Sequence, residues 1–313
     1  MWVEGLIVKE QSGFFWVETE AHGVVVCRLR GRLMEEAQSA DIAAIGDRAR
    51  ISLLLDGTGA VEAVAPRTSV LSRAVRTEGA RGAGQSEREQ VIIANADQAL
   101  CVFAAAQPAP SLRMLDRFLV IGEKSAIERL VIVVNKIDLV ERDAAEALFQ
   151  PYAEMGYTVV YTSALHKIGV DALRDLLHDR ISVFTGPSGV GKTSLLNAVQ
   201  PGLGRIVKDV SRVSQEGMHT TRDSELAKLD GGGYLADTPG LRTLTIWDVE
   251  PAELDAYFID IAPFVPECRF GDCTHRAEPG CAVRGAVKAG KIVRSRYQSY
   301  RVLREELEAA YAL

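Results

Sequence analysis

A glycine-rich motif between an apolar stretch and a helix-like stretch constrains this chain more than any other feature. The motif, G-x-x-x-x-G-K-[ST], covers residues 186–193, after the apolar residues 181–185 and before the helix-like residues 194–199. In this setting backbone N–H groups turn towards phosphate oxygens, Lys192 reaches the β- and γ-phosphates and Thr193 binds Mg²⁺. A glycine-rich turn that binds nothing is the weaker alternative. The predicted phosphate-binding residues are Gly186, Pro187, Ser188, Gly189, Val190, Gly191, Lys192, Thr193 and Ser194.

A second motif indicates which base is bound. N-K-x-D at residues 135–138 follows the apolar residues 130–134, at the carboxyl end where open α/β sheets bind ligands. An aspartate there accepts hydrogen bonds from N1–H and the exocyclic amine of guanine, whereas adenine would leave it unpaired. The motif therefore favours GTP over the alternative of an ATPase or nucleotide kinase. With the Ser-Ala pair after the next apolar run, the predicted base-binding residues are Asn135, Lys136, Asp138, Ser163 and Ala164.

The order of the motifs predicts a circularly permuted GTPase domain. D-x-x-G occupies residues 237–240, where Asp237 would hold Mg²⁺ through water and the Gly240 N–H would contact the γ-phosphate. In ordinary GTPases this motif precedes N-K-x-D and Ser-Ala, but here those two come first. A compact domain can be opened at a new point without moving its site residues. Because D-x-x-G now leads into residues 251–313, we expect the nucleotide state to reposition that region.

The segment before D-x-x-G contains the candidate switch and catalytic residues. One of Thr220 and Thr221 should bind Mg²⁺, and the sequence does not decide between them. Leu241 stands where many GTPases carry a water-orienting glutamine, and it cannot hydrogen-bond to the attacking water. His219 is therefore the candidate catalytic residue, with a purely structural role as the alternative.

The N-terminal residues predict a small barrel. Residues 1–66 alternate short β-like runs with turn signals, which favours an OB-type barrel, a fold that often binds nucleic acid. The expected strands are 3–9, 14–18, 24–29, 49–55 and 59–64. Arg28, Arg30 and Arg32 would share one strand face and bind phosphate, or else form a solvated edge. Most of the four aromatic residues near the N-terminus are expected in or near the core: Trp2, Phe14, Phe15 and Trp16.

The middle of the chain predicts a doubly wound parallel sheet. Residues 77–90 are polar and glycine-rich and predict a loop or a poorly ordered insertion. From residue 98 to residue 185, apolar strands alternate with helical segments, which is typical of such a sheet. The expected helices are 111–121, 142–155 and 170–177.

The C-terminal region predicts a metal site and a basic helix. After a helix expected over 251–264, three cysteines and one histidine in fourteen residues match the ligands of one structural Zn²⁺, with unpaired buried cysteines as the alternative. The predicted ligands are Cys268, Cys273, His275 and Cys281. The following basic residues, interleaved with Tyr297 and Tyr300, would bind a phosphate backbone or form a solvated helix face. They are Arg284, Lys288, Lys291, Arg294, Arg296, Arg301 and Arg304.

Composition narrows the class of protein. A chain of 313 residues with 47% hydrophobic and 25% charged residues suits a globular protein of two or three domains. The formal charge of −6 argues against a uniformly basic nucleic-acid binder. No apolar stretch approaches membrane-spanning length and no signal peptide is apparent. The five cysteines with their C-terminal cluster favour a reducing compartment, so we expect a cytoplasmic protein. Nothing in the sequence demands more than a monomer, and we expect one.

Taken together, the motifs resemble the RsgA family, the YjeQ/YloQ-type circularly permuted GTPases that depend on the small ribosomal subunit. The resemblance covers nearly the whole chain. It implies an OB-fold domain over 1–67, a permuted GTPase domain over 68–247 and a zinc-binding domain over 248–313. It also implies GTP hydrolysis stimulated by the small ribosomal subunit and its rRNA, in late maturation of that subunit, with His219 assisting. Two features depart from the family pattern: the insertion at 77–90 within the GTPase domain, and Arg222, where a third threonine is common.

The alternative function from a different class is a GTP-gated rRNA-binding module. In such a module GTP fixes a conformation on RNA, and hydrolysis is incidental to binding.

Overall fold

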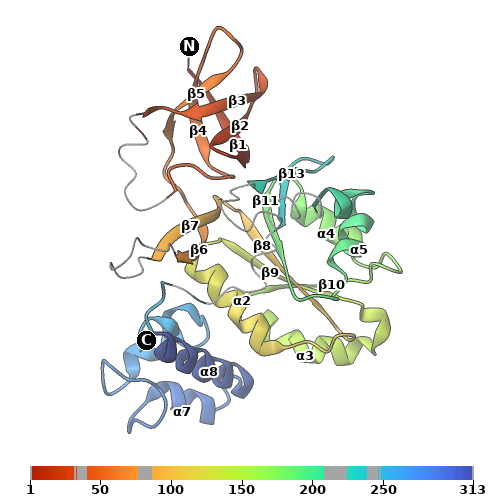
Figure 1. The fold of residues 1–313 in the computed structure, drawn as a ribbon. Coiled ribbons are helices and arrows are strands. Elements are labelled where there is room, and N and C mark those ends of the chain that lie inside the picture. Colours follow the sequence, from red (N-terminus) through yellow and green to blue (C-terminus); the bar gives the residue numbers. More distant parts are fainter. Residues whose placement is uncertain are drawn as a thin grey trace.

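The computed structural model describes residues 2–31, 33, 41–76, 87–207, 224–237, 246 and 248–311. They form an N-terminal barrel, a central α/β part and a C-terminal mainly helical part (Figure 1). This three-part architecture confirms the predicted fold class. No helix in these described ranges combines the length and the apolar character that crossing a bilayer requires.

The N-terminal barrel is closed and has five strands of its own. The strands are β1 (Trp2–Gln11), β2 (Phe14–Thr19), β3 (Gly23–Leu29), β4 (Arg48–Leu53) and β5 (Gly59–Val64). Their order is β1-β2-β3-β5-β4, and pairing of β1 with β4 closes the barrel. Alternate side chains such as Ile7, Val17 and Ile51 are fully buried inside it, as the period of two along a strand requires. Of the aromatic residues, Phe15 lies in this core but Trp2 is 60% exposed.

A two-stranded hairpin follows the barrel and corrects the prediction for residues 77–90. Strand β6 (Val70–Arg76) pairs antiparallel with β7 (Glu87–Ala94), so residues 87–90 belong to a strand and not to a loop. The Arg73 side chain donates a hydrogen bond to Gln90, 2.9 Å away. Such polar cross-strand pairs on a solvated hairpin do not produce the apolar alternation that marks a strand in the sequence. The rest of the predicted insertion, residues 77–86, lies outside the described residues.

The central sheet has the order β10-β9-β8-β11-β14-β13 and is parallel except for β13. Its strands are β8 (Gln98–Ala104), β9 (Arg129–Asn135), β10 (Thr158–Tyr161), β11 (Ile181–Thr185), β13 (Ala227–Lys228) and β14 (Tyr234–Asp237). The helices are α2 (Leu112–Lys124), α3 (Arg142–Glu154), α4 (Val170–Leu177) and α5 (Lys192–Val199), with the short η1 (Ile137–Leu139). Apolar side chains of α2 and α3 cover one face, and those of α4 and α5 cover the other. The predicted doubly wound sheet is thus confirmed.

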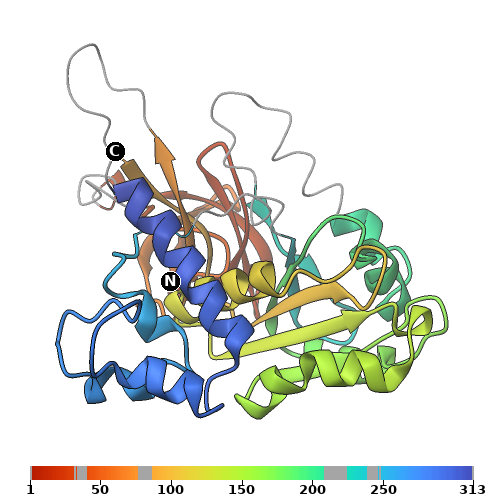
Figure 2. The ribbon, with the colours of Figure 1, turned by 90° about the horizontal axis from the view of Figure 1, so that it is seen from below.

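The C-terminal part has its own core and corrects the prediction of one helix over 251–264. In place of that helix there are two 3-10 helices, η3 (Leu254–Tyr257) and η4 (Ala262–Glu267). Pro263, inside the predicted range, lacks the N–H that an α-helix needs there. Two α-helices follow, α7 (Ala282–Lys288) and α8 (Arg294–Tyr311), and α8 packs against α2 of the central part (Figure 2).

Arg296 and Arg304, predicted to bind phosphate, are buried instead. The Arg296 guanidinium is 1% exposed and bridges Asp116 of α2 at 2.7 Å and Asp260 at 2.9 Å. It lies over the ring of Phe258, 4.6 Å from the ring centroid. Arg304 donates to the Tyr300 hydroxyl at 2.8 Å. Charge alone did not distinguish Arg296 from a residue of a solvated basic face, because its partners Asp116 and Asp260 are remote in sequence.

Replacing Arg296 by methionine is expected to destabilise this interface by about 3–5 kcal/mol, because Asp116 and Asp260 would remain buried without their counter-charge. Hydrogen exchange of the α8 amides measures this loss. Arg301→Met is the matched control, since Arg301 is exposed and lies 3.9 Å from Glu305, and it should change the same free energy by less than about 1 kcal/mol. Equal exchange in the two variants would contradict a stabilising role for Arg296.

Candidate functional site

The motif-bearing loops meet at one edge of the central sheet. Strands β9, β10, β11 and β14 are parallel, so their carboxyl ends lie on the same side. The N-K-x-D motif begins at the last residue of β9, and the Ser-Ala pair comes shortly after β10. The glycine-rich residues 186–193, called the phosphate loop here, follow β11, and Asp237 ends β14. This is the edge at which open α/β sheets bind ligands.

Asn135 ties three of these loops together. It is 1% exposed, and its side-chain amide donates to the carbonyl of Val190 in the phosphate loop at 2.9 Å. Its side-chain oxygen accepts hydrogen bonds from the Thr162 hydroxyl and the Ala164 N–H, both at 3.2 Å. A buried amide with all these partners fixes the relative position of the loops that carry N-K-x-D, Ser-Ala and the glycine-rich motif.

Lys136 and Asp138 are held by neighbouring loops. The Lys136 ammonium donates to the carbonyl of Gly189 at 2.7 Å and to that of Gln107. The Ser163 hydroxyl donates to the Asp138 carboxylate. Asp138 is exposed. Its carboxylate is therefore held by the loop that follows β10 while it remains accessible to solvent.

The phosphate loop has the backbone that its glycines predict. Gly186 has φ of +147°, and a Cβ there would lie 2.1 Å from the carbonyl oxygen of Val102. At Gly191, with φ of +90°, a Cβ would lie 2.6 Å from the Asn135 amide nitrogen. Any side chain at either position would displace the loop. Lys192 begins α5 and its ammonium donates to the carbonyls of Gly186 and Pro187, at 2.5 and 2.6 Å.

Several predicted site residues fall outside the described residues. These are His219, Thr220, Thr221 and Gly240. Two residues of the loop edge were not among those predicted from the sequence, namely Gln107, whose carbonyl binds Lys136, and Thr162, whose hydroxyl binds Asn135. A hydroxyl directly after an apolar strand was a usable signal for Thr162. A backbone carbonyl gives no signal in the sequence.

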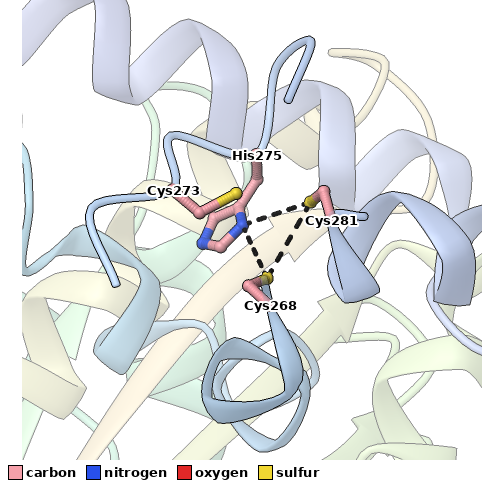
Figure 3. A group of neighbouring side chains, drawn as sticks. All are labelled: Cys268, Cys273, His275 and Cys281. Atoms are coloured by element: carbon pink, nitrogen blue, oxygen red, sulfur yellow. Dashed lines mark hydrogen bonds between the residues drawn. The ribbon is translucent and has the colours of Figure 1, made fainter. Parts of the chain in front are cut away.

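The four predicted metal ligands converge in the C-terminal part (Figure 3). Their ligand atoms all lie within 4.8 Å of one another. The His275 Nδ1 faces Cys281 Sγ at 3.4 Å and Cys268 Sγ at 3.6 Å. Three sulfurs and one imidazole nitrogen at this spacing fit a tetrahedral metal such as Zn²⁺, so the cluster could hold a zinc ion.

Asp255 orients the histidine of this cluster. The His275 Nε2 lies 3.1 Å from Asp255 Oδ2, and the imidazole is fully buried. When Nε2–H donates to this carboxylate, Nδ1 carries the lone pair that a metal needs. The sequence prediction did not include Asp255, because it lies on η3, well before the cluster in the chain.

Two family models match most of the chain. A model of the RsgA GTPase family matches residues 64–247, and a model of the RsgA N-terminal domain matches residues 4–61. The "Small ribosomal subunit biogenesis GTPase RsgA" of Gemmatimonas aurantiaca is 44% identical over 305 residues, which cover 97% of each chain.

Two solved structures share the whole architecture. YjeQ from Thermotoga maritima superimposes with a TM-score of 0.78 at 34% identity, covering 98% of this chain and 99% of the other. YloQ, described as a circularly permuted GTPase, gives 0.73 at 32% identity, covering 99% and 96%. The permuted motif order predicted from the sequence is thereby confirmed, and the chain belongs to the RsgA GTPase family.

Proposed function

We propose that this chain is a GTPase whose turnover is stimulated by the small ribosomal subunit, and that it acts in late maturation of that subunit. Membership of the family makes it a GTP-hydrolysing enzyme, and the name of its relatives supports the ribosomal role. One observation carries the nucleotide part of the proposal: Asn135 links the base-binding loops to the phosphate loop.

The proposed GTP site assigns a role to each loop. Asp138, held by Ser163, would read guanine, while the Ala164 loop supports the base. Lys192 and the phosphate-loop N–H groups would hold the β- and γ-phosphates, and Thr193 would bind Mg²⁺. From the sequence we assign a second magnesium contact to Asp237, through water. We likewise propose that the Gly240 N–H contacts the γ-phosphate and that the hydroxyl of Thr220 or Thr221 binds Mg²⁺. His219 would assist the attacking water.

The barrel offers an RNA-binding surface. The Arg50 guanidinium lies 4.1 Å from the ring centroid of exposed Trp2. The Arg28 guanidinium lies 4.3 Å from the ring centroid of Phe14. Aromatic rings beside cations suit both stacking with bases and attraction to phosphates. Arg30, in contrast, is bound to Glu62. We assign rRNA binding mainly to this barrel surface.

The domain limits follow the same proposal. We assign residues 1–67 to an OB-fold domain, 68–247 to the GTPase domain and 248–313 to a domain that binds one structural Zn²⁺, in line with the matched ranges. We further propose that the protein acts as a monomer in the cytoplasm.

GTP turnover with and without purified small ribosomal subunits tests the function. We expect strong stimulation by small subunits and none by large subunits or naked RNA. His219→Ala should lower the stimulated rate by about a hundred-fold or more, as loss of a group that assists proton transfer does. GTP-dependent binding to small subunits without stimulated turnover would instead favour a GTP-gated rRNA-binding module.

Replacing Asp138 by asparagine is expected to change base specificity. Asparagine cannot accept both N–H groups of guanine, which costs about 3 kcal/mol and lowers GTP affinity about a hundred-fold. Its amide can donate to the C2 carbonyl of xanthine, so affinity for xanthosine triphosphate should rise. Fluorescence titration with both nucleotides measures the change, with the exposed Asp143→Asn as control. Unchanged GTP affinity in Asp138→Asn would remove Asp138 from the site.

A further inference from the structure

Residues 224–228, called the strap here, add a sixth strand to the barrel. Strand β12 (Ser224–Glu225) pairs antiparallel with β1, so that Glu225 lies opposite Lys9. The Leu226 N–H donates to the Val8 carbonyl at 2.8 Å. The Lys9 ammonium lies 2.9 Å from the Glu225 carboxylate.

The second half of the strap belongs to the central sheet. Directly after Leu226, strand β13 pairs antiparallel with β14, the strand that ends at Asp237. The Leu226 side chain is 5% exposed and lies in one buried cluster with Ile45, next to the barrel, and Val183, in the central sheet. The strap is therefore shared by two sheets, with β12 in the barrel sheet and β13 in the central sheet.

The Glu18 side chain binds the barrel both to the strap and to β14. This β2 residue accepts a hydrogen bond from the Tyr234 hydroxyl at 2.6 Å and pairs with the Lys228 ammonium. Burial alone would raise the pKa of Glu18, but hydrogen bonds from Lys228 and Tyr234 lower it. The side chain is thus a carboxylate at neutral pH, bound to both β13 and β14.

A second attachment of the barrel does not involve the strap. Near the end of β7, the Ala94 N–H donates to the Ile45 carbonyl at 3.0 Å, and the Asn95 amide donates to the Gly46 carbonyl at 3.1 Å. A cleft of about 1010 Å³ opens between the barrel and the central part, lined by residues that include Arg48 and Arg180. Among the residues that the structure describes, the strap and the Gly46–Asn95 region hold the barrel on either side of this cleft, an arrangement that permits rotation about one of them.

The C-terminal part is attached differently. Buried Arg296 joins it to Asp116 of α2, and Lys124 of α2 lies 3.3 Å from Asp248. Helix α2 carries neither of the segments that respond to the γ-phosphate in GTPases. The strap, in contrast, lies between them in the chain: it follows Thr220 and Thr221, and β14 leads into D-x-x-G.

We propose that the strap sets the orientation of the barrel according to the bound nucleotide, while the C-terminal part stays fixed on α2. This inference rests on the GTP site proposed above and reverses the expectation that the C-terminal region is what moves. The segment with Thr220 and Thr221 and the D-x-x-G segment change conformation when the γ-phosphate binds, and this change displaces β12 and β13. Because β1 and Glu18 are bound to the strap, the barrel turns about its attachment at Gly46 and Asn95.

Distances between spin labels in the full-length protein test this coupling. Labels on non-natural ketone side chains at the exposed positions Leu55, Leu148 and Phe270 leave the cysteines untouched. The Leu55–Leu148 pair reports on the barrel and the Phe270–Leu148 pair on the C-terminal part. Each pair is measured with GDP and with a non-hydrolysable GTP analogue. We expect the nucleotide to shift the first distance and leave the second unchanged.

Matched variants assign the effect to the strap. Glu18→Ala removes the acceptor of Lys228 and Tyr234 and should abolish most of the nucleotide-dependent shift. Glu62→Ala removes a barrel carboxylate that likewise accepts two hydrogen bonds, from Arg30 and Ser52, and should retain the shift. Hydrogen exchange of the barrel amides verifies that both variants are folded.

Each other outcome overturns the inference. An equal shift in Glu18→Ala would show that the Glu18 attachment carries none of the coupling, which contradicts the role proposed for it. A shift only in the Phe270–Leu148 distance would show that the C-terminal part is the responsive one. If both nucleotides bind and neither distance changes, the coupling is wrong but the GTP site stands. If a fluorescent GTP analogue does not bind at all, the proposed function and the inference fail together.

Discussion

Replacing Lys192 by alanine is expected to reduce GTP turnover by about a hundred- to a thousand-fold, the usual loss when one preorganised group that stabilises transition-state charge is removed. The Lys192 ammonium lies inside the phosphate loop, where the carbonyls of Gly186 and Pro187 accept its hydrogen bonds. Its charge is thus held inside the loop in which we propose that the β- and γ-phosphates bind. Part of the loss should also appear as weaker binding of GTP.

The measurement is phosphate release with saturating GTP and Mg²⁺, without and with small ribosomal subunits. Lys288→Ala is the control without subunits, because Lys288 is exposed on α7, away from the loop edge. Turnover by Lys192→Ala within a few-fold of the unmodified protein would mean that the phosphate loop does not perform the chemistry. In that case the hydrolytic site would have to be sought elsewhere in the chain.

The loops of this site could be predicted because each motif is local. The phosphate loop carries its strand, glycines and helix within about twenty residues, so the sequence alone indicated its conformation. The contacts of Asn135 show what local motifs leave out. Its partners Thr162 and Val190 are far from it in the chain, and only the parallel strand order brings the three loops together.

The errors at Arg296 and in strand β7 have a non-local cause. Arg296 resembled a phosphate-binding residue because the residues around it are basic, but its partner Asp116 lies 180 positions away. Strand β7 has polar residues where the hairpin is solvated, and its pairing with β6 is invisible in a window of a few residues. The two-residue strands of the strap carry no periodicity at all. Pattern analysis finds elements that are long or chemically marked, and it misses those that tertiary contacts define.

Replacing Cys281 by serine is expected to remove the metal and unfold much of the C-terminal part. Cys281 Sγ lies 3.4 Å from His275 Nδ1 and 4.0 Å from Cys268 Sγ, and it also accepts the Arg284 N–H at the start of α7. A serine hydroxyl is a much poorer zinc ligand than a thiolate. Structural zinc sites supply about 10–16 kcal/mol of apparent binding energy, which becomes folding energy.

Metal content by mass spectrometry and hydrogen exchange of α7 and α8 measure the effect. The unmodified protein should contain one Zn²⁺ per chain, and Cys281→Ser close to none. Cys27→Ala is the control, because Cys27 is buried in the barrel and burial raises the pKa of its thiol to about 11; it should retain the metal. Asp255→Ala should keep the ion but lower its affinity about ten- to a hundred-fold, as expected for loss of a carboxylate that orients a histidine ligand.

Hydrogen exchange in α2 and in the barrel shows how far the unfolding caused by metal loss extends beyond the C-terminal part. Arg296 binds Asp260 of the C-terminal part as well as Asp116 of α2, so unfolding around the cluster should expose α2 and raise its hydrogen exchange. The barrel amides should remain protected, because their attachments run through Glu18 and Asn95 and not through α2. Full protection of α7 and α8 in metal-free Cys281→Ser would contradict a structural role for the ion. It would leave the apolar core around Phe258 and Tyr300 as sufficient to fold this part of the chain.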